Sequence, residues 1–348
     1  MAAVKRNKVA QLQVQDGKLG NTRDGCADSP MATRSLEVRE LESSELRAWD
    51  RFVEQSPQGT IFSESFWLNL YGFPFRVLAC YKGDEIVGGV TVFEDEPPNS
   101  MMSLVPFTPF HGFLFRNNAS MKPPLREKLE KKVSFALIDA LEHRYRNITL
   151  CHHYNFEDVR PFYFHTYGQE SEYTVAVRYT SVVDLSDIHR AWSNMDVNTH
   201  CEIHKGEKRG NIVQESDDFE LFDSIHRRTF ERHGGKRAVP SELLARMYLK
   251  LKEENRCQLF LARKTAGNPT SVGLTIWDKR RAYHWLAGSE PEHRNDGSAS
   301  LTLWTIFQRM SERFPEIDLV GCNSPKRGAF KAGFGGTLKH YFVTSLTR

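Results

Sequence analysis

The sequence predicts an α/β protein whose mixed sheets form two similar domains in tandem. The chain has 348 residues, which is long for one domain and suits two of about 150. Hydrophobic residues make up 40% of it and aromatic residues 11%, enough to fill two cores. A helix pair, a hairpin, a long helix and a strand occur in this order twice along the chain, which favours a repeated architecture.

The start of the chain differs in composition from the rest. Residues 1–35 contain no aromatic residue and are rich in Lys, Arg, Asn, Gln, Asp and Gly. Such a segment cannot bury enough surface to offset the entropy lost on ordering, so we expect a disordered tail. Met31 offers an alternative start of translation. We place the first domain at residues 36–185 and the second at residues 186–348.

Hydrophobic periodicity predicts the elements of the first domain. Apolar residues recur with helical spacing in residues 46–53, 66–71 and 125–145. Before the long helix, two strand-like segments joined by Gly83-Asp84 predict a hairpin. The predicted strands are Arg76–Tyr81, Glu85–Glu94, Ile148–Cys151 and Tyr173–Asp184.

The second domain repeats this plan. Two helices precede two strands that are joined by a Gly267-Asn268 turn. A further strand, Arg281–Ser289, leads through a short loop into a long helix, Ser300–Phe314, whose apolar residues form one stripe. The remaining predicted elements are the helices Phe219–Phe230 and Ser241–Lys252 and the strands Cys257–Arg263, Ser271–Trp277, Ile317–Cys322 and His340–Leu346.

The loop between that strand and that helix is the most informative segment. It reads Arg294-Asn295-Asp296-Gly297-Ser298-Ala299. Backbone N–H groups at the start of a helix are unpaired, and the helix dipole adds partial positive charge there. Gly297 permits close approach of a phosphate and Arg294 adds charge, so we expect this loop to bind a phosphate-bearing coenzyme. A turn that merely caps the helix is the alternative.

Composition argues against several classes of protein. The net charge of +3 is close to neutral for this size and gives no support to DNA binding. No segment approaches about 18 consecutive apolar residues and no secretory leader is evident, so we expect no membrane-spanning helix. The cysteines lack C-x-x-C spacing, which favours reduced thiols and a cytoplasmic protein. They are Cys26, Cys80, Cys151, Cys201, Cys257 and Cys322.

The loop Arg294–Ala299 spells R-x-x-G-x-A, which resembles the acyl-CoA pyrophosphate loop of the GNAT acyltransferases. Four other segments resemble FemAB-like and BioF2-like acyltransferases and follow one another in the order of that family. The resemblance covers roughly residues 36–348. The four segments are Trp49–Phe62, Asp158–Gly168, Cys201–Gly210, which resembles a basic helix, and Gly328–Gly336, which resembles an F-K-x-x-F-G-G signature.

This resemblance implies two tandem GNAT-like acyltransferase domains, of which the second carries the acyl-donor loop. Members of the family move an acyl or aminoacyl group to an amine or a hydroxyl. Some use acyl-CoA, and others use aminoacyl-tRNA on a lipid-linked precursor. Cys201 and His204 stand where the family often has Arg in the basic helix, which weakens the expectation of tRNA contacts there.

Acyl transfer needs a donor to the carbonyl oxygen and a base for the proton of the acceptor. In the GNAT plan the oxyanion donor is a backbone N–H, here in Leu286–Ser289. For the catalytic base we weigh Asp318, at the start of a predicted strand, and His284, on the strand before the loop. A solvent-facing acid and a buried structural imidazole are the respective alternatives. Glu290 is a third, weaker option.

Four further residues are predicted to bind substrates. His111 lies in a loop rich in Pro and Phe that suits an acceptor cleft, and Lys326, Arg327 and Lys331 form a basic group for a phosphate or carboxylate. A rigid structural loop and a solvated basic turn are the alternatives. No metal site is predicted, because neighbouring ligand types such as Cys151-His152-His153 lack a second cluster that completes a tetrahedral set.

The sequence therefore favours a cytoplasmic acyltransferase with acyl-CoA as co-substrate and a small-molecule or lipid-linked acceptor held between the two domains. An aminoacyl-tRNA-dependent transferase that acts on a cell-envelope precursor is the alternative, although near-neutral charge argues against tRNA binding. A third hypothesis is a non-catalytic GNAT-like binding protein. The retained phosphate loop argues against it.

Overall fold

The computed structural model describes residues 35–95, 100–103, 105–231 and 239–348. The expected disordered tail, residues 1–35, lies outside the described residues apart from Ser35.

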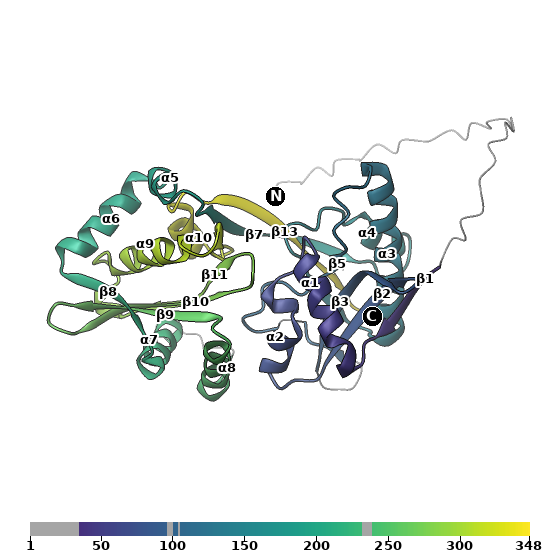
Figure 1. Cartoon of the computed structure of the whole chain (residues 1–348), viewed down its shortest axis with the longest axis horizontal. Coiled ribbons are helices and arrows are strands. Elements are labelled where there is room, and N and C mark those ends of the chain that lie inside the picture. The colour runs from purple at the N-terminus through teal and green to yellow at the C-terminus, as the bar shows by residue number, and fades with distance from the viewer. Residues whose placement is uncertain (1–34, 96–99, 104, 232–238) are drawn as a thin grey trace, which may run out of the picture. The chain divides into compact units, whose positions relative to one another are not determined.

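The first half of the chain builds an antiparallel sheet with the strand order β1-β2-β3-β4 and with β5 beside β3 (Figure 1). The predicted hairpin is confirmed, because β2 and β3 pair across the Gly83-Asp84 turn. The elements of this half are β1 (Leu36–Glu40), α1 (Leu46–Gln55), α2 (Ser65–Leu70), β2 (Phe75–Lys82), β3 (Glu85–Asp95), β4 (Ser100–Met101), β5 (Leu114–Phe115), α3 (Pro123–Arg144), β6 (Ile148–Cys151), α4 (Arg160–His165) and β7 (Thr174–Asp184).

The second half contributes six strands to a mixed sheet with the order β6-β13-β7-β12-β11-β10-β9-β8. Within this sheet β11 and β12 pair in parallel, and the other neighbouring pairs are antiparallel. The elements of this half are α5 (Ile188–Ser193), α6 (Val197–Lys208), β8 (Asn211–Ser216), α7 (Phe219–Glu231), α8 (Ser241–Glu253), β9 (Cys257–Lys264), β10 (Pro269–Trp277), β11 (Ala282–Ser289), α9 (Ser298–Ser311), β12 (Glu316–Asp318), α10 (Pro325–Ala332) and β13 (Thr337–Leu346).

The two halves share one order of elements. In each half two helices precede a hairpin, and a long helix, a strand, a short helix and a last strand follow. The series α3-β6-α4-β7 therefore corresponds to the series α9-β12-α10-β13.

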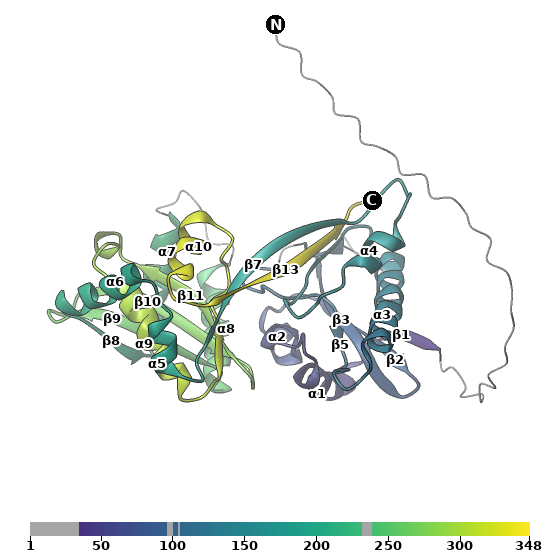
Figure 2. The same cartoon turned by 90° about the horizontal axis from the view of Figure 1, so that it is seen from above.

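The last strand of each half pairs with a strand of the other half, and all four of these strands lie in the eight-stranded sheet. β7 pairs with β12 through Val183 and Ile317, whereas β13 pairs with β6 through Leu346 and Ile148. β7 and β13 also pair with each other, and Figure 2 shows them running side by side. Leu346 lies in the hydrophobic core of the first half and Val183 in a core of the second. Strand pairing thus crosses residue 185, where we placed the domain boundary, in both directions.

A third hydrophobic cluster joins aromatic residues from both halves. The ring centroid of Phe62 lies 5.0 Å from that of Tyr283, and the centroid of Trp67 lies 5.5 Å from that of Trp285. All four side chains are buried. Since Tyr283 and Trp285 belong to β11, the helical segment around Trp67 packs directly against this strand.

The predicted strand Ile317–Cys322 is wrong at its C-terminal end, because β12 stops at Asp318. The backbone turns into the left-handed region at Val320, with φ of 31°, and at Gly321, with φ of 62°. An L-residue such as Val320 rarely adopts this conformation, so its side chain gave no sign of the turn.

Periodicity does not predict α5 and α10, because they contain only 6 and 8 residues. The start of α5 has a signal that the sequence analysis missed. Asp187 accepts the backbone N–H groups of His189 and Arg190 with its side chain, which is the usual geometry of a helix N-cap. The helix that the family resemblance placed at Cys201–Gly210 is confirmed as the C-terminal part of α6.

In the described part of the chain, no helix combines the length and the apolar character that crossing a membrane requires. Five of the six cysteines lie in this part, and all five are free thiols. Cys26 lies outside it.

The exchanged strand makes a testable prediction about stability. Leu346→Ala should lower the free energy of unfolding of the protein by about 2–5 kcal/mol, because Leu346 is 1% exposed in the core of the first half. Urea denaturation measures this value. Leu338→Ala, in the same strand but 63% exposed, is the matched control and should change it by less than about 0.5 kcal/mol. Equal effects of the two substitutions would contradict the exchange.

Candidate functional site

The edge of β11 that faces β12 is paired over only two residues. The ladder joins Ala282 to Ile317 and Tyr283 to Asp318 and then ends. On its other edge β11 continues to pair with β10, with a bulge at Trp285. Residues 284–289 therefore form an unpaired edge, in the sense that no strand among the described residues pairs with them on the β12 side. Backbone N–H groups on such an edge are available to a ligand, except that of Ser289, which donates to the hydroxyl of Thr229 at 3.3 Å.

Asp318 ends β12 beside this unpaired edge. Its carboxylate is buried, and Oδ1 accepts the backbone N–H of Val320 at 2.8 Å and the hydroxyl of Thr180. Oδ2 is buried and has no hydrogen-bond partner among the described residues. Burial raises the pKa of Asp318 to about 6, against the opposing effect of these two hydrogen bonds and of the positive charges of Arg281 and Lys331. At neutral pH the group is mostly ionised.

Lys331 reaches the same place from α10. Its Nζ donates to the carbonyl oxygen of Leu319 at 2.5 Å and to that of Val320. Burial lowers the pKa of Lys331 to about 8, while the negative charge of Asp318 works against this decrease. An ammonium group has three donors, so one N–H remains after these two bonds. A half-buried cation and a buried carboxylate thus flank the end of β12.

Arg281 connects this site to the first half of the chain. Its guanidinium is buried and donates to the ring Nε2 of His153 at 3.0 Å and to the hydroxyl of Tyr154. Its Nε lies 3.2 Å from the carboxylate of Glu316 on β12. The charge of Arg281 also lowers the pKa of Asp318. Contacts from the first half therefore hold a cation near the proposed base.

The loop before α9 is filled by one of its own side chains. Asp296 is buried, and its Oδ1 accepts the backbone N–H of Ser298 at 3.0 Å. Its Oδ2 lies 2.7 Å from Nζ of Lys264 and 3.2 Å from Nδ1 of His293. A carboxylate thus already accepts one of the N–H groups at the helix start, where a phosphate would bind.

Gly297 is required by helix packing. Its φ is 82°, and a Cβ at this position would lie 2.1 Å from the carbonyl oxygen of Glu202 and 2.5 Å from the backbone nitrogen of Gly206. The start of α9 therefore crosses α6 at very short distance. Arg294 and Asn295 are exposed, so these two residues of the loop are accessible to a ligand.

Comparison with known proteins agrees with this geometry. Residues 199–331 match the family model described as Acetyltransferase (GNAT) domain. This match lies within the second half of the chain. No curated protein matches the chain in sequence.

Solved structures extend the likeness in fold to the first half. FemX has a TM-score of 0.61 at 14% identity, with 88% of this chain and 96% of that chain covered. The C-terminal domain of a putative lysylphosphatidylglycerol synthetase from Agrobacterium fabrum has a TM-score of 0.55 at 11% identity, covering 87% and 92%. A tandem GNAT protein from the clavulanic acid biosynthesis pathway has a TM-score of 0.52 at 11% identity, covering 90% and 98%. The predicted fold class of two tandem GNAT-like domains is confirmed.

His284 lies on β11, one residue after Tyr283, the register partner of Asp318. It is buried between β10 and α9, where its ring lies 3.5 Å from the position of a Cβ on Gly273, beside Thr302 and Ile306. Burial lowers the pKa of His284 to about 3, so the imidazole is neutral at pH 7. A base this weak is poorly matched to a proton released near neutral pH.

The residues predicted to bind substrates do not come together. His111 is 1% exposed, and its backbone N–H bonds to the carbonyl oxygen of Cys151 at 2.8 Å, so it is inside the protein and away from solvent. Lys326 and Arg327 are exposed on α10, whereas Lys331 turns inward to the end of β12. The predicted basic group therefore does not form one cluster, because Lys326 and Arg327 lie on the surface and Lys331 points inward.

The loop that contains His111 contributes a different contact with the second half of the chain. The indole N–H of Trp285, at the bulge of β11, donates to the carbonyl oxygen of Phe107 at 2.9 Å. Phe107 has a φ of 60°, which is unusual for a bulky residue. The loop is thus fixed against the strand that carries the unpaired edge. The sequence analysis missed this role, although the cluster of Pro and Phe marked the loop.

Asp158 and Glu290 are both engaged in ion pairs. Asp158 and Arg160 form an ion pair at 2.8 Å. The carboxylate of Glu290 pairs with Arg228, so it is engaged on the side of α7. Among the residues that the structure describes, no group of His, Cys, Asp and Glu is arranged to hold a metal ion.

The raised pKa of Asp318 predicts how stability depends on pH. A buried carboxyl that prefers to be protonated stabilises the fold below pH 4, and this contribution disappears as the pH rises through about 6. Between pH 4 and pH 7 the free energy of unfolding should therefore decrease more in the wild type than in Asp318→Asn, by about 3 kcal/mol. Urea denaturation at several pH values measures the difference.

A neighbouring residue provides the control for this experiment. Asp184 is exposed on the adjacent strand β7, and hydrogen bonds from Ser186 lower its pKa. Asp184→Asn should therefore shift the pH dependence in the opposite direction. Parallel curves for the wild type and Asp318→Asn would show that Asp318 has an ordinary pKa.

Proposed function

We propose that the protein is an acyltransferase that moves an acyl group from acyl-CoA to an amine, or a hydroxyl, at the unpaired edge of β11. The observation that carries this proposal is the position of this edge next to Asp318, whose buried Oδ2 has no partner among the described residues. Acyl transfer uses both features: N–H groups for the carbonyl oxygen and a carboxylate for the proton.

The carbonyl group of the donor would lie along residues 286–289 of β11. Backbone N–H groups that are fixed in a strand stabilise the negative charge on the tetrahedral intermediate without having to reorganise. The acceptor nitrogen forms a bond to the carbonyl carbon, and the bond to sulfur breaks. The thiolate of CoA leaves, and the proton of the acceptor passes to a base.

Asp318 is the base that the geometry supports better. A pKa of about 6 leaves the carboxylate ionised at neutral pH yet close enough in basicity to accept a proton, whereas the pKa of His284, about 3, is too low. The ammonium group of Lys331 lies at the same strand end and stabilises negative charge there. Because these groups are buried, their charges interact more strongly than they would in water.

The donor is proposed to contact the loop Arg294–Ala299 with its phosphates. Exposed Arg294 supplies positive charge, and Asn295 supplies further polar atoms. The acceptor is proposed to enter from the side where Phe107 and Trp285 meet, between the two halves.

One observation favours the aminoacyl-tRNA-dependent alternative. The carboxylate of Asp296 already takes the N–H of Ser298 at the helix start, which competes with a pyrophosphate. A donor that places its phosphates elsewhere, such as an aminoacyl-tRNA used on a cell-envelope precursor, avoids this competition. Binding of charged tRNA that weakens steeply with salt would support this alternative. A protein that binds neither donor would fit a non-catalytic role.

Asp296 provides the first test of the donor. Asp296→Asn should increase the affinity for coenzyme A about tenfold, because it removes a negative charge from the helix start and keeps an oxygen for the N–H of Ser298. Isothermal titration calorimetry measures the dissociation constant. Glu292→Gln, an exposed change in the preceding turn, is the control and should have a much smaller effect. An unchanged affinity in Asp296→Asn would place the phosphates away from this loop. Substituting Gly297 is a poor test, because it disturbs the packing of α6 on α9.

The pH dependence of activity tests the base. The value of kcat/KM should rise tenfold per pH unit below about 6 and level off above it, because the ionised form of Asp318 is the active one. Asp318→Asn should lose about 10²–10⁴-fold in kcat at pH 7. His284→Gln is the companion variant and should keep the pH profile of the wild type. A profile that is unchanged in Asp318→Asn would exclude this residue as the base.

A further inference from the structure

The first half of the chain contains a counterpart of the region around the end of β12. By the correspondence of elements, the start of α3 and the segment between β6 and α4 are the equivalents of the start of α9 and the segment between β12 and α10. A cavity of about 530 Å³ lies at this place. We call it the α3 cavity; the residues that line it include Gln58, Phe115, Asn118, Arg126, Glu130 and Lys131.

The start of α3 cannot hold a phosphate in the way a glycine loop does. Its first two residues are Pro123 and Pro124, which have no backbone N–H. The N–H groups of the next two residues, Leu125 and Arg126, bond to the carbonyl oxygen of Lys122 at 2.9 and 3.0 Å. The N–H groups that would bind a phosphate at this helix start are therefore missing or used. A ligand of the α3 cavity must be recognised by side chains.

Most polar side chains of the α3 cavity are fixed by each other. Gln58 donates to the carbonyl oxygen of Asn155 at 2.9 Å and accepts the N–H of Phe115 at 3.1 Å. Arg160 is held by Asp158 and Glu127, each at 2.8 Å. These bonds build a rigid wall that offers little free charge.

Four charged side chains of the α3 cavity, Glu130, Glu157, Arg126 and Lys131, lack a close partner of opposite charge. Glu130 receives only a long contact of 3.5 Å from Asn118 and forms no ion pair with a described residue; burial raises its pKa. Arg126 lies 3.9 Å from Glu157, at the limit of an ion pair. Lys131 forms no ion pair within the described part of the chain. Two carboxylates and two cations without a close partner therefore face a single cavity, and Glu157 is the more exposed of the two carboxylates.

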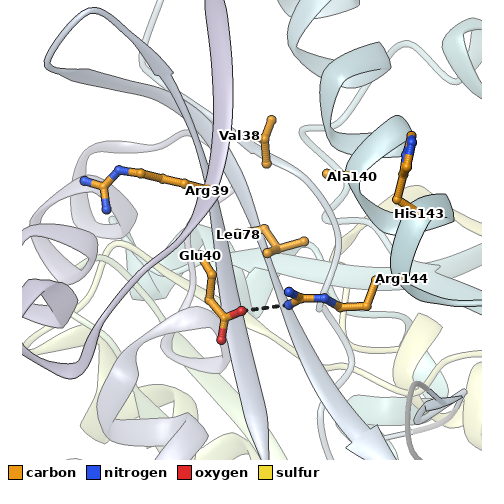
Figure 3. A pocket seen from close by; sticks show the side chains of 7 residues that line it. All are labelled: Val38, Arg39, Glu40, Leu78, Ala140, His143 and Arg144. Atoms are coloured by element: carbon orange, nitrogen blue, oxygen red, sulfur yellow. Dashed lines mark hydrogen bonds and ion pairs between the residues drawn. The ribbon is translucent and has the colours of Figure 1, made fainter.

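In another hollow on this half of the protein, the charged side chains do have close partners of opposite charge. It lies between β1 and the end of α3 and is drawn in Figure 3, where the carboxylate of Glu40 and the guanidinium of Arg144 point toward one another. These groups are 2.7 Å apart, and Glu40 also pairs with Arg76 at 2.6 Å. Arg39, on its rim, pairs with Glu45. The charges of this hollow are satisfied by the protein, and it suggests no ligand.

We propose that the α3 cavity binds a free α-amino acid, with the ammonium group of the ligand on Glu130 and its carboxylate on Arg126 and Lys131. A zwitterion supplies both missing charges and leaves the net charge of the site unchanged. A phosphate would meet Glu130 and find no backbone N–H, and a simple cation would leave Arg126 and Lys131 without partners. The proposal does not depend on the identity of the acyl donor.

Calorimetric titration of the full chain with L-alanine, L-glutamine and L-phenylalanine tests this site. At least one of the three should bind. Glu130→Gln and Arg126→Gln should each weaken its binding tenfold or more, since each variant removes one of the two charges that the zwitterion needs. Glu253→Gln, an exposed change on α8 outside the cavity, is the matched control and should bind like the wild type. Thermal melting of each variant confirms that it is folded.

Two compounds that each carry only one of the two charges of an amino acid make the test specific for a zwitterion. Propylamine carries the ammonium group without the carboxylate, and propionate carries the carboxylate without the ammonium group. Both should bind at least tenfold more weakly than the amino acid. Equal binding of propylamine, displacement of the amino acid by inorganic phosphate, or no binding of any of the three amino acids would each overturn the proposal.

Discussion

The pairing of β7 with β13 is the constraint on which the rest of the structure depends. Each of these strands ends one half of the chain and pairs with a strand of the other half, so the eight-stranded sheet is built from both halves. Their pairing also positions the site. Thr180, which donates to Asp318, belongs to β7, and Val182 on the same strand is the register partner of Asp318. A residue of the first half thereby fixes the proposed base of the second.

The site is shaped by burial more than by the number of charges. Asp318, Lys331 and Arg281 are withdrawn from water, and their pKa values and orientations follow from the few groups that reach them. In the loop before α9, both oxygens of the Asp296 carboxylate are paired with groups of the protein. The carboxylates therefore differ: Oδ2 of Asp318 has no partner among the described residues, whereas Oδ2 of Asp296 forms an ion pair with Lys264.

The sequence predicts the parts of this fold in which neighbours along the chain decide the structure. The Gly83-Asp84 hairpin and the long helices α3 and α9 follow from local periodicity and turn chemistry. What it does not predict depends on distant contacts. Val320 ends a strand by adopting a left-handed conformation that its β-branched side chain disfavours. Lys331 reads as part of a basic surface group, and it turns inward only because two carbonyl groups of another segment are available.

The glycine of the loop shows how one residue supports two different interpretations. From the sequence, Gly297 indicated a place where a phosphate comes close to the backbone. In the structure its missing side chain is needed by a helix, because the backbone of α6 lies where a Cβ would be. Both interpretations require a glycine, and only the three-dimensional contacts separate them. The same holds for His111, which a local motif placed in a cleft and which the fold buries.

The strand exchange has a consequence for the way the protein is made. A nascent chain leaves the ribosome from its N-terminus, and domains commonly fold in that order during synthesis. Here the core of the first half contains Leu346 from β13, so it stays incomplete until the entire second half has been translated. During that interval the edge of β6 that β13 later covers is exposed, and an open strand edge is a site of mispairing and aggregation. Production of this protein in cells should therefore respond to the speed of translation and to chaperones that bind unfinished chains.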